Sequence, residues 1–83
     1  MTMLEETITA RYENTNDIGI AVVAVLTHDH LDRLLDWTAY IGASTNNRYE
    51  SAAVAAAAKF GNKLSQADAH YYFPSLPLEK YRL

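Results

Sequence analysis

The sequence predicts a small α+β fold in two layers, an antiparallel sheet covered on one face by two helices, in the order β-β-α-α-β. Three observations predict this: polarity alternates over residues 7–13, residues 18–26 form an apolar run, and two later segments have helical spacing. We expect the 83 residues to form a single domain, 1–83. A chain of this length buries only roughly 60 to 65% of its unfolded surface, which is too little for two domains. One sheet with one layer of helices is the arrangement that such a pattern favours.

The first two strands are expected to form a hairpin. From Thr7 to Glu13 the residues alternate in polarity, as in a half-buried strand. The residues expected to share one face are Ile8, Ala10 and Tyr12. Residues 14–17, Asn-Thr-Asn-Asp, have the chemistry of a turn. The second strand, Ile18–Leu26, is apolar on both faces and should therefore be central in the sheet.

Two helices are expected next. Thr27 has the character of an N-cap, and apolar residues at helical spacing follow it until Gly42 stops the helix near Ile41. Residues 44–47 offer the next cap, and an alanine-rich helix should run from Arg48 to about Leu64. The apolar face expected on this second helix consists of Tyr49, Ala53, Ala56, Phe60 and Leu64.

A third strand is expected near the C-terminus. Residues 68–73 are rich in aromatics, and the strand should end before Pro74. Pro74 and Pro77 cannot donate a ladder hydrogen bond, so residues 74–83 are predicted to form an irregular tail.

Composition narrows the classes of function. The absence of cysteine favours a reducing, cytoplasmic setting. A net charge of −3 argues against direct binding to nucleic acid or to an anionic membrane. No stretch approaches the roughly 20 apolar residues that span a bilayer. Glycine-rich nucleotide loops and nucleophile elbows are also missing from the sequence, so we expect no enzymatic activity and no cofactor.

The most specific string is Thr-His-Asp-His-Leu-Asp-Arg at 27–33, directly after the apolar run. It resembles the metal-binding signature of the metallo-β-lactamase superfamily. The resemblance implies that His28 and His30 hold a first zinc and that Asp32 serves a second, while Arg33 stands where that family has its last histidine. The alternative is an ordinary helix start in which Asp29 pairs with Arg33 one turn later. We favour the helix start, and a small hydrolase-like metal site remains the alternative.

Partner binding is the function that the remaining features favour. Asp29, Asp32 and Asp36 would form an acidic stripe on the exposed side of the first helix, flanked by Tyr40. Such a stripe suits a basic surface on another protein. Tyr71 and Tyr72 are consecutive, so in a strand one of them would face a partner or a second copy. Those two tyrosines complete the predicted contact set.

Three features together resemble the small phage-encoded inhibitor proteins known as anti-CRISPRs. They are the hairpin over 7–26, the alanine-rich helix Ser51–Phe60 and the acidic stripe. The resemblance implies a non-enzymatic protein that binds a larger protein or nucleoprotein effector in the host cytoplasm and blocks it stoichiometrically. A homo-oligomeric assembly protein, for example a homodimer, is a further alternative.

Overall fold

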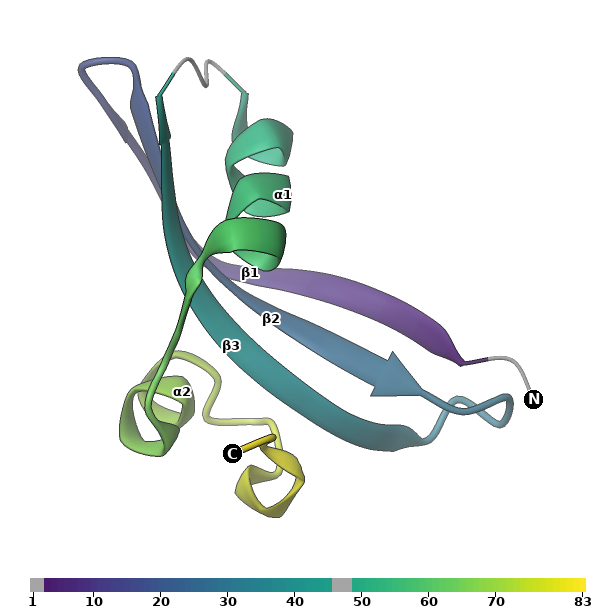
Figure 1. Cartoon of the computed structure of the whole chain (residues 1–83). Helices are drawn as coiled ribbons and strands as arrows, with labels where there is room; N and C mark the ends of the chain where they lie inside the picture. The colour runs from purple at the N-terminus through teal and green to yellow at the C-terminus, as the bar shows by residue number, and fades with distance from the viewer. Residues whose placement is uncertain (1–2, 46–48) are drawn as a thin grey trace.

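The computed structural model describes residues 3–45 and 49–83. In this part of the chain, four strands form one antiparallel sheet in the order β1-β2-β3-β4, with two α-helices (Figure 1). The elements are β1 (Leu4–Thr15), β2 (Ile18–His28), β3 (Leu34–Thr45), α1 (Glu50–Phe60), β4 (Asn62–Lys63), α2 (Gln66–Tyr72) and a 3-10 turn (Leu78–Lys80). The α+β class and the antiparallel sheet are confirmed. The observed order is β-β-β-α-β-α, so the predicted order β-β-α-α-β is wrong.

The predicted hairpin is present, with strands longer than expected. Asn16 and Asp17 form its loop with φ angles of 52° and 63°. This left-handed conformation is one that Asn and Asp adopt readily, and two such residues make the loop type that suits the twist of the strands. The turn chemistry of the sequence therefore sets the register of the hairpin.

A β-bulge at Ala10 divides β1 into two halves. On the N-terminal side Ile8 lies opposite Ala24, whereas on the C-terminal side Tyr12 lies opposite Ala21. The bulge inserts one residue without a partner, so the side chains change face across it. The prediction that Ile8, Ala10 and Tyr12 share one face is therefore wrong.

The first predicted helix is a tight turn followed by β3. Along β3, Trp37 and Ala39 are buried on one face, whereas Asp36 and Tyr40 lie on the other, which is the alternation of a strand. Leu35 marks a second irregularity, since His28 pairs with Leu34 and the neighbouring pair resumes at Asp36. Aromatic and β-branched residues in this segment suit a strand better than a helix.

Two cores lie on opposite faces of the sheet, because successive residues of β2 point to opposite sides. The α1-side core contains Ala21, Val23, Ala53 and Ala57. The tail-side core contains Val22, Ala24, Leu26, Trp37, Ala39, Ala69, Phe73 and Tyr81. The prediction that both helices cover one face is wrong: α1 covers one face, and α2 with the C-terminal tail covers the other.

Helix α1 rests on the sheet through small residues. Ala53 and Ala57 are buried, and Gly42 of β3 has no side chain to hold the helix away. Tyr49 and Phe60 are 72% and 85% exposed, so the predicted apolar face is wrong except at Ala53. The helix ends at Gly61, and the predicted caps among residues 46–47 and the predicted start at residue 48 lie outside the described residues.

Helix α2 occupies the segment predicted to be the third strand. Ser65 caps it, accepting a hydrogen bond from the backbone N–H of Asp68 at 3.2 Å. Ala69 and Phe73, four residues apart, pack into the tail-side core. The cap and this spacing outweigh the strand preference of the aromatic run. Within residues 3–45 and 49–83, no helix is long and apolar enough to cross a membrane.

The C-terminal tail is irregular apart from its 3-10 turn, and it is anchored on Trp37. The Trp37 side chain is fully buried and donates its indole N–H to the Pro77 carbonyl at 2.7 Å. The rings of Tyr81 and Phe73 contact it edge-on, with centroids at 4.7 and 6.0 Å. The Tyr81 hydroxyl donates to the carbonyl of Leu64. One indole therefore joins the tail, α2 and β3.

Candidate functional site

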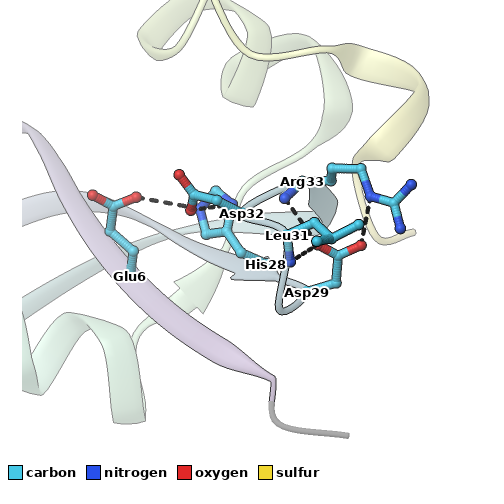
Figure 2. A network of polar contacts seen from close by, with 6 residues as sticks. All are labelled: Glu6, His28, Asp29, Leu31, Asp32 and Arg33. Carbon is cyan, nitrogen blue, oxygen red and sulfur yellow. Dashed lines mark hydrogen bonds and ion pairs between the residues drawn. The ribbon is translucent and has the colours of Figure 1, made fainter.

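The predicted acidic stripe does not form, because Asp29 belongs to the turn between β2 and β3. Asp29 is only 4% exposed. Its carboxylate accepts hydrogen bonds from the backbone N–H groups of Leu31 at 2.9 Å and Arg33 at 3.0 Å, and from the Arg33 guanidinium at 2.8 Å (Figure 2). The backbone donation from Arg33 is the largest of the effects that hold the pKa of Asp29 below its usual value. Asp29 is therefore a structural residue of the turn.

The string that resembles a metal signature is spread over this turn. Figure 2 shows His28 between two carboxylates: its Nε2 lies 3.3 Å from Glu6, and its Nδ1 lies 3.8 Å from Asp32. Asp32 is exposed at a left-handed φ of 60°, and His30 is exposed as well. Over the described ranges, no three His, Cys, Asp or Glu side chains gather so that they could hold a metal ion. The turn therefore does not bring His28, His30 and Asp32 together as ligands of one metal ion.

Two of the predicted contact residues, Asp36 and Tyr40, do lie together, in a groove beside α1. This α1 groove has a volume of about 400 Å³. Its lining residues are Glu5, Thr7, Val25, Thr27, Asp36, Thr38, Tyr40, Ala55, Ala58, Lys59 and Arg82. The groove thus joins three strands, α1 and the tail.

The α1 groove exists because α1 is shorter than the sheet. In Figure 1, α1 lies over the end of the sheet near the hairpin loop, and the strands continue beyond it. On the uncovered part, Thr27 pairs across the strands with Glu5 and Asp36. In the next row, Val25 pairs with Thr7 and Thr38. The floor of the groove therefore consists mainly of hydroxyl and carboxylate side chains.

Charges of both signs line the α1 groove. Arg82 forms an ion pair with Asp36, and this hydrogen bond is the main reason that the pKa of Arg82 is raised. Lys59 contributes an ammonium group from α1, and Glu5 contributes a carboxylate from β1. Such a surface offers donors and acceptors to a polar partner, and the exposed Glu5 carboxylate can receive a lysine or arginine side chain.

The predicted tyrosine pair lies on the other face of the sheet. Tyr71 and Tyr72 belong to α2, not to a strand, and their rings meet edge-on at 5.0 Å. Tyr71 is 77% exposed, while Tyr72 lines a small cavity of about 210 Å³ with Arg11. The structure therefore does not bring the tyrosine pair together with Asp36 and Tyr40.

Several groove residues were missed by sequence reasoning. The threonines of β2 and β3 could have been found by reading residues 36–40 with a period of two, because Asp36, Thr38 and Tyr40 then share a face. Arg82 carries no local signal, since its contact with Asp36 spans 46 residues of the chain.

Comparison with known proteins finds no matching family model, no matching curated protein and no matching solved structure.

Proposed function

We propose that this chain is a non-enzymatic protein-binding module that occupies a surface of a larger effector through the α1 groove. The observation that carries the proposal is the meeting of Asp36 and Tyr40 with Glu5, Lys59 and Arg82 around one concavity. This groove replaces the helix face as the contact surface.

A basic surface of another protein is the partner chemistry that suits this groove. The exposed carboxylate of Glu5 can receive a lysine or arginine side chain of the partner, next to Asp36, which is ion-paired with Arg82. The net charge of −3 would also speed the encounter with a basic protein. These properties agree with stoichiometric inhibition in the host cytoplasm, which the resemblance to small phage-encoded inhibitors implies.

Charge reversal at Glu5 tests the proposal without disturbing a core. Glu5 is exposed and lines the α1 groove, whereas Glu79 is exposed on the 3-10 turn and does not line it. The wild-type chain, Glu5→Lys and the matched control Glu79→Lys are each used as bait in host lysate, with identification by mass spectrometry. We expect a basic protein that binds the wild type and Glu79→Lys but not Glu5→Lys.

Equal capture of that protein by Glu5→Lys would contradict the proposal, and so would equal loss with both variants. The complex should also weaken as salt is added, because exposed charges are screened. The mass of the isolated chain in solution separates this function from the assembly alternative. A stable homodimer whose interface buries Glu5 would favour the assembly protein.

A further inference from the structure

The outer edge of β3 is only partly covered. Strand β4 pairs with β3 at Tyr40 and Ile41 and then ends. The strand β3 itself continues to Thr45. Among the described residues, no strand pairs with the outer side of Gly42–Thr45. Four residues of strand edge, about 13 Å long, therefore present backbone N–H and C=O groups without a described neighbouring strand.

A second groove, the edge groove, follows this edge of β3. It lies on the opposite side of α1 from the α1 groove. Its volume is about 500 Å³. The residues that line this edge groove are Ile41, Gly42, Ala43, Ser44, Thr45, Ala56, Phe60, Gly61 and Asn62. No charged side chain is among these lining residues, so the surface differs in chemistry from the α1 groove.

Exposed aromatic rings stand at both ends of the helix that borders the edge groove. Tyr49 precedes α1, Phe60 is its last residue, and both rings are exposed. Within α1, Ala56 and Phe60 are four residues apart, so they lie on the same side of the helix, and both line the edge groove. An apolar side chain placed next to β3 would find Ala56 and Phe60 as its neighbours.

The close packing of α1 on β3 fixes the width of the edge groove. A Cβ atom at Gly42 would lie 2.7 Å from the Cα of Ala57, so α1 sits as near to the strand as a glycine allows. Gly61 then carries the chain from α1 directly into β4. The edge groove is therefore already formed in the isolated chain.

The two edges of the sheet differ in the features that discourage pairing. Strand β1 has a bulge at Ala10 and four charged side chains, two devices that proteins use to block edge-to-edge association. Those charged residues are Glu5, Glu6, Arg11 and Glu13. Gly42–Thr45 contains no charge, no proline and no shift of register.

We propose that an extended, uncharged segment of a partner protein adds to β3 as a further strand at Gly42–Thr45, in line with β4. A row of backbone donors and acceptors at a strand edge is satisfied by another extended backbone. Alternate side chains of the added strand would point toward α1 and pack on Ala56 and Phe60. This interaction is separate from the α1 groove and does not depend on the function proposed for it.

The test uses a capped peptide of alternating valine and threonine, long enough to span Gly42–Thr45, as the probe. The control peptide has the same sequence with N-methylated valines, which cannot donate backbone hydrogen bonds. Both are titrated into the full chain while amide chemical shifts and hydrogen exchange are recorded. The variants are Phe60→Ser and the matched control Tyr71→Ser, which removes an exposed ring from α2.

We expect the probe to shift and protect the amides of Gly42–Thr45, and the N-methylated peptide to leave them unchanged. Phe60→Ser should weaken probe affinity by roughly tenfold, as for the loss of one aromatic anchor. Tyr71→Ser and Glu5→Lys should leave probe affinity unchanged, which separates this surface from the α1 groove.

Protection confined to β1, equal binding of the N-methylated peptide or equal affinity after Phe60→Ser would each overturn the proposal. So would an absence of any shift at millimolar probe. If the chain without probe has twice its monomer mass and already protects Gly42–Thr45, the occupant is a second copy, which also overturns the assignment to a partner's segment.

Discussion

Replacing Gly42 by alanine should separate α1 from the sheet. The new Cβ would lie 2.7 Å from the Cα and 3.0 Å from the Cβ of Ala57, whereas apolar carbons normally approach to about 3.5–4.0 Å. The clash is with helix backbone, so no side-chain rotation relieves it, and α1 must move outward by about 1 Å. Overpacking of this kind costs about 2 kcal/mol. For a chain of this size, that corresponds to a decrease in melting temperature of about 10 °C.

The assay is urea unfolding followed by circular dichroism and by the fluorescence of Trp37. Trp37 lies in the tail-side core, so its native signal should be unchanged while the unfolding midpoint falls. Ala43→Ser, at the exposed neighbouring position, is the control and should change stability by less than about 0.5 kcal/mol. A Gly42→Ala protein as stable as the wild type would refute the close-packing argument.

Three further predictions concern the tail and the turn. Trp37→Phe removes the donor to the Pro77 carbonyl and should cost about 1 to 2 kcal/mol in chemical unfolding, with faster hydrogen exchange in the tail; unchanged exchange would contradict it. Asp29→Asn loses the ion pair with Arg33 and should destabilise the fold at neutral pH. Because the pKa of Asp29 is depressed in the folded state, the carboxylate stabilises the fold above its unfolded pKa of about 3.9, and this stabilisation disappears as pH falls through the folded pKa. The free energies of unfolding of the wild type and Asp29→Asn, measured against pH, should therefore converge in acid. Zinc should not raise the melting temperature of the untagged chain, since the two ring nitrogens of His28 face different carboxylates; a stoichiometric rise that His28→Gln abolishes would show otherwise.

The hairpin and α1 could be predicted because their signals are local. Asn16 and Asp17 specify the loop by their own backbone preferences, and the alanine run has few alternatives to a helix. Residues 34–45 were assigned wrongly because their apolar positions fit both a helical and a strand period. Long-range pairing with β2, which covers this segment from end to end, decides the matter in favour of a strand.

Part of the candidate site, Asp36 with Tyr40, could be predicted, and the reason is geometric. Asp36 and Tyr40 are four residues apart, a spacing that keeps two side chains on one face in a helix and in a strand alike. Their grouping therefore survived the wrong assignment of secondary structure. Asp29 and Asp32 were lost from the group because the turn reverses the chain, and the Asp29 carboxylate there accepts hydrogen bonds from the backbone N–H groups of Leu31 and Arg33. Arg82 joins the site only through the folding of the tail, which no local pattern encodes.

The bulge at Ala10 gives β1 a share in both cores. Its first half contributes Ile8 beneath the tail, and its second half contributes Tyr12 beneath α1. If Ala10 were instead paired in a regular ladder, the second half of the strand would slip by one residue, so that Tyr12 would leave α1 and Arg11 would take its place there. The one extra residue thus allows Ile8 and Tyr12, which would share a face in a regular strand, to pack into two different hydrophobic layers.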